Sequence, residues 1–552
     1  MLRAMIGASL AVLYPLVHAH DYEAAPGQKV EALGQVQFEV SCNAAAQTEF
    51  NRAMALFHSF WFDPAIRSFR HVLEQDPDCG MADWGIAIMS MGNPFAWPAN
   101  PKAMKAAAEA AAEAQRVGAG SQRERDYIAT LPAYFKDWET APHAARAKAF
   151  AAAAGAVADR YPKDDEAQIL YALLLDATAL PSDKTFANQR KAAAILEPLF
   201  KKYPNHPGVA HYLIHTYDYA GLAEQGLPAA RAYGAIAPSV PHALHMPSHI
   251  YARTGDWQGM IDSNRASYET AKAELSDKTA GVGAYDALHA MDYMVMAELQ
   301  FGRDQAAHTV VDEAAAIRKV NVENFPAAYA LAAIPARYAL ERSDWAQASQ
   351  LSLSPPEMAW ARFPQAEAIL VFSRGLGEAR AGKVQAAQSD LARLNQLKET
   401  MQTLALSYWV QQAGVQIDAM GAWIALAEHR DDEALRLMQA AADAEDASDK
   451  HPVTPGNVVP MRALLGEMLL ELKQPKAARS EFERSLKRDP NRLRTLFGAG
   501  KAAQASGDRE AAVGYYERVS ALGARGDGTR PEFVHAREFL ASSAQPTGKV
   551  RQ

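Results

Sequence analysis

The sequence predicts an all-α protein, a right-handed solenoid of about ten to twelve stacked helix pairs. Alanine is abundant, runs of β-branched residues are rare, and no long stretch alternates apolar and polar residues with period two. Glycine or aspartate turns and proline stops recur at steps of 34 to 47 residues. At 552 residues the chain is also too long for one compact core, which favours a repeat array or several domains.

The N-terminus has the features of a secretory signal peptide, residues 1–19. Arg3 precedes a mostly apolar run from Ala4 to Val17, and Val17-His18-Ala19 fits a cleavage site. The run is short for a transmembrane helix, although an uncleaved anchor is the alternative. No other stretch of 18 apolar residues occurs. We therefore expect a periplasmic or secreted protein with no transmembrane segment in the mature chain.

Cys42 and Cys79 are the only two cysteines. In an exported protein, two cysteines suggest one disulfide. Cys42 precedes the first helix of the first repeat and Cys79 follows its second helix, so this bridge would close that repeat. Two buried free thiols are the alternative.

The mature chain divides into segments by its turns and proline stops. Ala65, Phe69 and Pro77 mark the first clear repeat, and Ala478, Phe482 and Pro490 repeat the same spacing late in the chain. We expect a leader at 20–42, repeats at 43–204, 205–320 and 321–446, C-terminal repeats with a cap at 447–542, and a disordered tail at 543–552.

This spacing resembles the tetratricopeptide repeat, a helix–turn–helix unit, over nearly all the mature chain. The chain also resembles a group of exported bacterial repeat proteins in Phe57-His58-Ser59-Phe60-Trp61, Asp76-Pro77-Asp78-Cys79, His242–His249 and His451-Pro452-Val453-Thr454-Pro455-Gly456. That group has no settled activity, so the resemblance implies architecture and export but no reaction. It also implies that a peptide, protein or small-molecule ligand would lie in the concave groove lined by the first helix of each repeat.

Histidines are concentrated in the middle of the chain, where six of the 16 lie between residues 211 and 292. His211 and His215 are four residues apart, as are His245 and His249, and the two pairs are separated by 34 residues. Residues four apart share a helix face, and stacked repeats bring equal positions side by side. We therefore expect these four imidazoles to converge on the groove.

Further groups join this cluster if the next repeat is aligned with a step of 47 residues. His242 then corresponds to His289, and His245 to Asp292, while Asp218 also takes a groove position. Imidazole and carboxylate groups bind transition metals, so the pattern predicts a divalent copper, zinc or iron ion. Three protein ligands with a water would make a catalytic site, and four a closed one. The predicted ligands are His211, His215, His242, His245, His249, His289, Asp218 and Asp292.

Arg337 is also placed in the groove, where it would hold a carboxylate or phosphate, or form a salt bridge across the groove. Tyr212 and Ser248 flank the histidines and are further candidates for ligand contact. The net charge of -8 without a basic block gives no support to nucleic-acid binding. The sequence lacks a His-Glu-x-x-His or Gly-x-Ser-x-Gly motif. Two functions stand: an envelope metalloprotein, which could be an enzyme, or a scaffold that binds a partner without metal.

Overall fold

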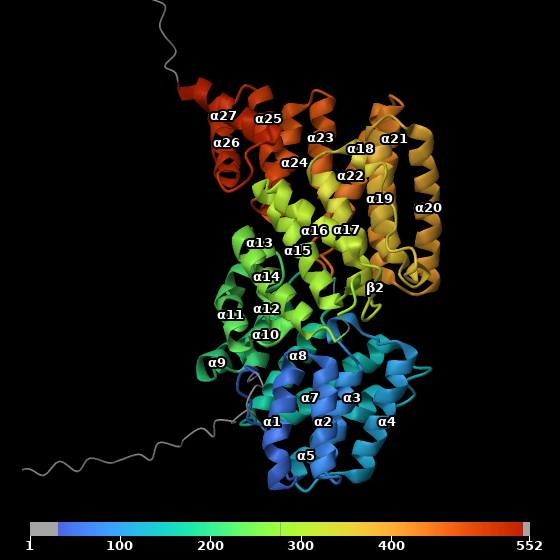
Figure 1. Cartoon of the computed structure of the whole chain (residues 1–552), viewed down its shortest axis with the longest axis vertical. Helices are drawn as coiled ribbons and strands as arrows, with labels where there is room; N and C mark the ends of the chain where they lie inside the picture. Colours follow the sequence, from blue (N-terminus) through green and yellow to red (C-terminus); the bar gives the residue numbers. More distant parts are fainter. Residues whose placement is uncertain (1–30, 181, 277, 545–552) are drawn as a thin grey trace, which may run out of the picture. The chain divides into compact units, whose positions relative to one another are not determined.

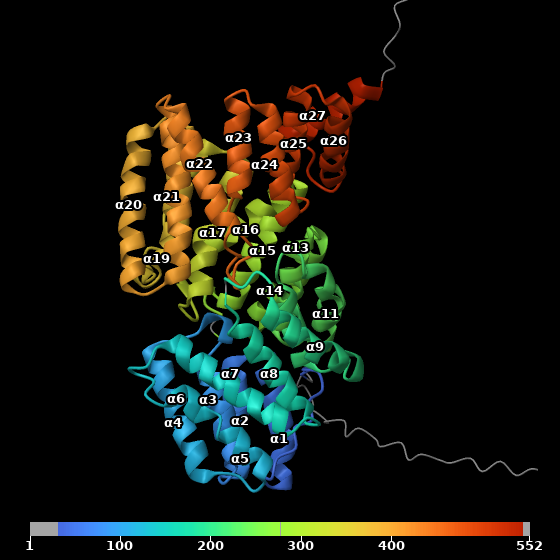
Figure 2. The same cartoon turned by 180° about the vertical axis from the view of Figure 1, so that it is seen from behind.

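Helix pairs follow one another along almost the whole chain, and the predicted all-α solenoid is confirmed (Figures 1 and 2). The computed structural model describes residues 31–180, 182–276 and 278–544, and from Leu33 onward they form one unit. Within these residues the strands are two short parallel segments, β1 (Val282–Gly283) and β2 (Lys319–Val320). The predicted signal peptide lies outside the described residues.

The first helices build the N-terminal repeats. They are α1 (Ala44–His58), α2 (Phe62–Gln75), α3 (Gly80–Ser90), the 3-10 turn η1 (Pro94–Ala96), α4 (Pro101–Val117), α5 (Gln122–Ile128), α6 (Leu131–Phe135), α7 (His143–Arg160), α8 (Asp165–Ala177) and α9 (Ala187–Lys202). The side chain of Asn43 caps α1 by accepting a hydrogen bond from the Ala46 amide. Cys42 and Cys79 form a disulfide with a Cα–Cα distance of 5.2 Å, which ties the start of α1 to the end of α2.

The central helices carry the histidines. They are α10 (Pro207–Tyr217), α11 (Ala223–Ile236), α12 (Pro241–His245), α13 (Pro247–Thr254), α14 (Trp257–Glu274), α15 (Tyr285–Phe301) and α16 (Asp304–Ala316). Helices α13 and α15 end at Gly255 and Gly302, whose φ angles of 71° and 65° lie in the left-handed region. Glycine takes that conformation without a steric penalty, which is why these two residues end the first helix of each pair.

The C-terminal helices continue the pairs. They are α17 (Phe325–Glu341), α18 (Trp345–Ala348), η2 (Trp360–Arg362), α19 (Pro364–Arg380), α20 (Val384–Thr403), α21 (Ser407–Ala427), α22 (Asp431–Asp446), α23 (Met461–Glu471), α24 (Pro475–Arg488), α25 (Leu493–Ala505), α26 (Arg509–Gly523) and α27 (Pro531–Ala544). Phe482 fills the space that Gly466 and Gly498 leave on the neighbouring helices, where a Cβ atom would come within 2.8 and 2.4 Å of its ring. Large side chains that pack on small ones set the close approach of these helices.

The last repeats also contact the central ones. The Trp257 indole donates to the Asn491 carbonyl at 2.9 Å, and the Arg303 guanidinium donates to the Arg525 carbonyl at 2.6 Å. Among the described residues, no helix is long and apolar enough to cross a membrane.

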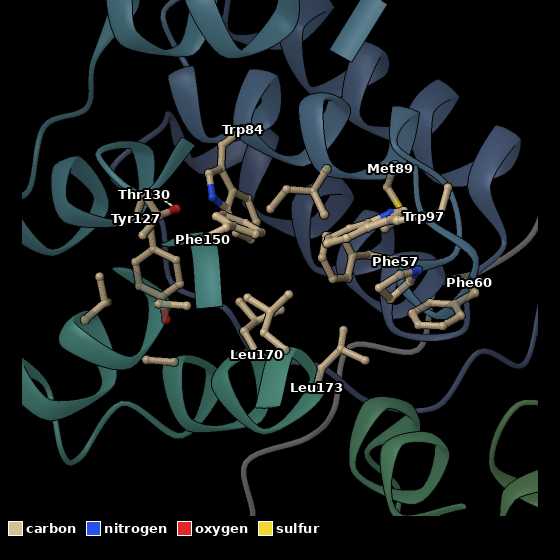
Figure 3. Close-up of a pocket in the computed structure, with 17 residues that line it drawn as sticks. Phe57, Phe60, Trp84, Met89, Trp97, Tyr127, Thr130, Phe150, Leu170 and Leu173 are labelled. Carbon is tan, nitrogen blue, oxygen red and sulfur yellow. Dashed lines mark hydrogen bonds between the residues drawn. The ribbon is translucent and has the colours of Figure 1, made fainter. Parts of the chain in front are cut away.

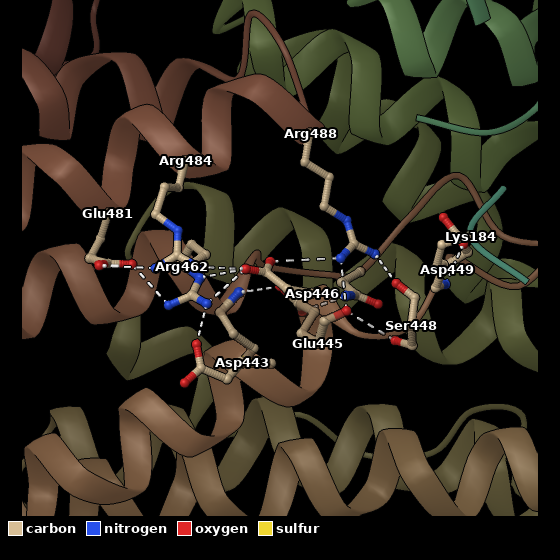
Figure 4. Close-up of polar contacts among 12 residues, drawn as sticks. Lys184, Asp443, Glu445, Asp446, Ser448, Asp449, Arg462, Glu481, Arg484 and Arg488 are labelled. Carbon is tan, nitrogen blue, oxygen red and sulfur yellow. Dashed lines mark hydrogen bonds and ion pairs between the residues drawn. The ribbon is translucent and has the colours of Figure 1, made fainter. Parts of the chain in front are cut away.

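Residues 447–460, which we call the closing segment, connect α22 with α23 and reach toward the histidine-bearing helices. Arg488 holds the start of this connection by donating to the carbonyl oxygens of Glu445 and Ser448, both at 2.7 Å (Figure 4). Lys184 pairs with Asp449 at 3.0 Å, so the segment is also tied to the N-terminal half. Arg488 of α24 and Lys184 of the N-terminal half therefore hold the first part of the closing segment in place.

We predict that the Cys42–Cys79 bridge stabilises the first repeat. Closing a loop with a sequence separation of 37 residues restricts the unfolded chain and contributes about 3–4 kcal/mol. Adding reductant should lower the melting temperature of the parent protein and leave that of the Cys42→Ala, Cys79→Ala double variant unchanged. Equal melting temperatures for the parent with and without reductant would argue against this role.

Candidate metal centre

The six predicted histidines lie together, but in two groups of three. His211, His215 and His242 form the first triad, and His245, His249 and His289 form the second triad. Within each triad one ring nitrogen per residue lies within 4.8 Å of the others. The first triad joins α10 to α12, and the second joins α12 and α13 to α15. The pair His211 and His215 is therefore completed by His242 of α12. The equivalent pair, His245 and His249, is completed by His289 of α15.

The first triad converges through its Nε2 atoms. His211 Nε2 lies 3.1 Å from His215 Nε2 and 3.2 Å from His242 Nε2. Two nitrogen ligands of one tetrahedral zinc ion, at 2.0–2.1 Å from it, stand about 3.3 Å apart. The spacing of these nitrogens is therefore close to that of ligands around a shared ion. His211 Nδ1 donates to the His58 carbonyl at 2.7 Å, which leaves its Nε2 lone pair free.

In the second triad, hydrogen bonds determine which nitrogen carries the proton in two of the rings, His245 and His249. His245 Nδ1 lies 2.6 Å from the Asn264 Oδ1 atom, which can only accept, and the Asn264 amide nitrogen donates to the Met260 carbonyl. His249 Nδ1 lies 3.0 Å from Asp218 Oδ2, also an acceptor. Both Nδ1 atoms must therefore donate. In the neutral rings the two Nε2 lone pairs then lie 3.0 Å apart, a contact that a shared cation would make favourable. The Tyr293 hydroxyl lies 3.3 Å from both His249 Nε2 and the Val453 carbonyl, and its single proton can go to only one of them.

Burial keeps these rings uncharged. It lowers the pKa of His211 and of His289 to about 3, and neighbouring histidines add to the effect. Burial also holds the pKa values of His215, His242 and His245 well below the usual range. Because an unprotonated imidazole has a lone pair to donate, the six rings are ready to bind metal near neutral pH.

Asp218 lies behind the second triad, on the Nδ1 side of His249. It also accepts hydrogen bonds from Arg253 Nε at 2.9 Å and from Lys450 of the closing segment. Burial opposes its ionisation, but Lys450 and Arg253 hold the pKa of Asp218 below its usual range. The Asp218 carboxylate therefore orients the His249 ring, an arrangement common around metal-binding histidines.

Asp292, the other predicted carboxylate, is paired with Arg337. The Arg337 Nε atom lies 2.7 Å from Asp292 Oδ1, and its terminal nitrogens donate to the carbonyls of Gly456 and Asn457 at 2.8 and 3.0 Å. Both side chains of this pair are buried. Of the two roles considered for Arg337, the structure shows the salt bridge to Asp292. The hydrogen bonds of Arg337 to Gly456 and Asn457 also anchor the closing segment.

Tyr212 and Ser248 are buried beside the triads. The Tyr212 hydroxyl lies 2.9 Å from His58 Nδ1. The Ser248 Oγ atom is buried and has no hydrogen-bond partner among the described residues. Neither side chain lines the pocket described below.

A third cluster is absent from the sequence-based prediction. Glu166 accepts from His58 Nε2 and His206 Nε2, both at 2.9 Å, and all three side chains are buried. Because both carboxylate oxygens already have a histidine partner, the cluster is complete as a hydrogen-bonded unit. The sequence spacing carries no signal for it, since His58 and Glu166 are 108 residues apart. The sequence gives no signal for Lys450 for the same reason, since it lies 232 residues from Asp218.

Both triads open onto one pocket of about 240 Å³. His242 and His289 are the partly exposed members of their triads, and both line it, together with His215 and His249. The rest of the lining is Phe60, Trp61, Phe62, Asn93, Ala96, Met246, Tyr285, Asp286, Asn324, Phe325, Pro326, Pro452 and Val453. An ion in either triad would therefore have an accessible side.

A separate apolar cavity of about 40 Å³ also has Phe60 in its lining (Figure 3). Trp84, Trp97 and Phe150 line it among other residues, with little polar surface. Phe60 borders both spaces, and its ring centroid lies 4.4 Å from that of His211. Phe95 stacks on His215 with a centroid distance of 4.0 Å. Two aromatic rings from the N-terminal repeats, Phe60 and Phe95, thus pack against the first triad.

Comparison with known proteins identifies one repeat of a described family. Residues 459–492 match the tetratricopeptide repeat family. A tetratricopeptide repeat protein from Parabacteroides merdae is 12% identical, with 55% of this chain and 99% of that one covered and a TM-score of 0.29. Human IFIT1 is 12% identical (88% and 96% covered, TM-score 0.37), and yeast Tom70 is 13% identical (90% and 95% covered, TM-score 0.28). No curated protein matches the sequence. The repeat match and the succession of helix pairs support a place in the tetratricopeptide-repeat superfamily.

We predict that the metal-free protein loses stability as the pH falls below about 6.5, the usual pKa of histidine. The buried rings stay neutral in the folded chain but take up protons in the unfolded chain, so acid favours unfolding. Each such ring lowers the free energy of unfolding by about 1.4 kcal/mol per pH unit. Thermal melts from pH 7 to pH 4.5 test this.

A His211→Gln variant should show a shallower dependence on pH than the parent, because one titrating group is lost. The exposed His308 provides the matched control, and His308→Gln should follow the parent. A melting temperature of the parent that stays constant between pH 7 and pH 4.5 would contradict the prediction.

Proposed function

We propose that this chain is an exported metalloprotein in which each triad binds one divalent transition-metal ion. The observation that carries the proposal is the pair of Nε2 lone pairs of His245 and His249, which face each other at 3.0 Å. Their Nδ1 hydrogen bonds to Asn264 and Asp218 prevent either ring from placing a proton between them without becoming charged. Burial disfavours that charge on both rings. A metal ion removes this repulsion and uses both lone pairs.

Two ions suit the geometry better than one. The ring centroids of His215 and His249 are 6.2 Å apart, as are those of His242 and His245, whereas neighbouring rings within a triad have centroids 4.3–5.0 Å apart. Each ion would have three imidazole ligands and an open position toward the pocket. That coordination is typical of catalytic rather than structural zinc sites. Imidazole ligands suit copper, zinc and iron, and the metal analysis below distinguishes among them.

Export is part of the proposal. The predicted signal peptide directs the chain across a membrane, and the Cys42–Cys79 disulfide is typical of proteins from an oxidising compartment. We infer a periplasmic or secreted location.

A partner-binding scaffold is the second candidate, because the matched repeat at 459–492 belongs to a family of helical repeats. In that case the pocket between the triads would hold part of a peptide, protein or other ligand without metal. Metal analysis separates the two functions.

We predict two metal ions per chain in protein purified without a histidine tag and exposed in turn to zinc, copper and ferrous iron. His211→Ala, His215→Ala should remove the ion of the first triad, and His245→Ala, His249→Ala that of the second triad. The control His308→Ala should retain both ions. Elemental analysis with circular dichroism as a folding check gives the result, and a folded parent without metal would leave the scaffold function.

We further predict that Asp218→Asn weakens metal binding at the second triad by about 10- to 100-fold, because the amide orients and polarises His249 less well than the carboxylate. The first triad of the same molecule is the internal control and should keep its affinity. Competition with a chromophoric chelator measures both affinities. Equal weakening at both triads would show that the substitution acts through the fold instead.

A further inference from the structure

The pocket in front of the triads is walled by aromatic side chains that remain partly exposed. Trp61, Phe62, Tyr285 and Phe325 line it, and none of them is fully buried. Phe62, Tyr285 and Phe325 are the first residues of α2, α15 and α17, so three helix starts form the rim. Exposed aromatic surface that is gathered in a concave site usually marks a place where a ligand binds.

The wall continues inward as a column of nearly parallel rings. Phe62 and Phe60 have centroids 5.7 Å apart with an interplanar angle of 24°, and Phe60 and His242 have centroids 5.9 Å apart with the same angle. The column thus leads from the rim to the first triad. A flat ring that enters beside it can stack on aromatic faces while its edge reaches the open position of an ion.

The polar groups of the lining restrict what can bind. Asn93 and Asn324 offer amides and Asp286 a carboxylate, and no lysine or arginine is among the lining residues. A phosphate or a peptide carboxylate would find no fixed cation other than the metal ions themselves. With a volume of about 240 Å³, the pocket suits a molecule of one ring better than a long chain.

We propose that this pocket binds a small single-ring phenol, with its ring against the aromatic wall and its hydroxyl oxygen on a metal ion of the triads. The inference rests on the proposed metal-binding function and adds the class of ligand. It joins two independent features of the structure, the open sides of the triads and the partly exposed aromatic rim. Phenol is the simplest molecule that satisfies both.

The test uses full-length protein loaded with cobalt(II), whose visible bands report on its ligands. The metal content is measured first. Phenol and azide are then titrated separately, since azide can bind the metal without touching the aromatic wall. Both should shift the visible bands of the parent.

Phe62→Ala and Phe325→Ala should each weaken phenol binding by about tenfold, as expected for the loss of an aromatic contact, and leave azide binding unchanged. Phe497→Ala is the matched control, because Phe497 is a partly buried phenylalanine in a different pocket. It should bind both probes as the parent does.

Three results would overturn the inference. If the loaded parent responds to azide but not to phenol, or if the rim variants weaken both probes equally, the aromatic wall is not a phenol site and the metal-binding function still stands. If the folded parent takes up no cobalt, zinc, copper or iron, the metal-binding function and this inference fail together.

Discussion

The hydrogen bonds on the Nδ1 side of the buried histidines are the constraint on which the centre depends. The His58 carbonyl, the Asn264 amide oxygen and the Asp218 carboxylate each bind one Nδ1 atom of His211, His245 or His249. Each acceptor determines the tautomer and the orientation of its ring, so three Nε2 lone pairs point inward. Burial then keeps the rings neutral, because a charged imidazolium would lose its hydration. The same two effects support the proposed metal site and the predicted loss of stability of the metal-free protein in acid.

Two of the contacts that support the centre come from distant parts of the chain: the His58 carbonyl lies 153 residues from His211, and Lys450 lies 232 residues from Asp218. His58 ends α1, Asn264 lies on α14, and Asp218 follows α10 and pairs with Lys450 of the closing segment. The closing segment is held in turn by Arg337 of α17, which donates to the Gly456 carbonyl, and by Arg488 of α24, which donates to the Ser448 carbonyl. A repeat array that contacted only its nearest neighbours could not supply these partners. The contacts between the last and the central repeats therefore have a role in positioning the site as well as in stability.

Aromatic side chains divide the space around the centre into two environments. Phe60 separates the small apolar cavity from the pocket that the triads share, and its φ angle of 52° is unusual for a residue other than glycine. Phe95 covers His215 from the same side. The first triad is thus shielded by rings toward the N-terminal repeats and open toward the pocket. The second triad opens onto the same pocket through His249 and His289, so each proposed ion would have an accessible side there.

The sequence by itself determined the helical class, the order of the repeats and the concentration of histidines at repeat-equivalent positions. These properties follow from local periodicity, since residues four apart share a helix face and repeats of 34 residues bring equal positions together. Only the tertiary structure decided that the six histidines form two triads, that Asp218 orients a ring, and that Asp292 pairs with Arg337. Those outcomes depend on how far one helix is rotated against the next and on contacts such as Lys450 with Asp218, which are 232 residues apart. Such long-range packing leaves no periodic signal in the sequence, so the groups that complete the centre could be identified only in the folded chain.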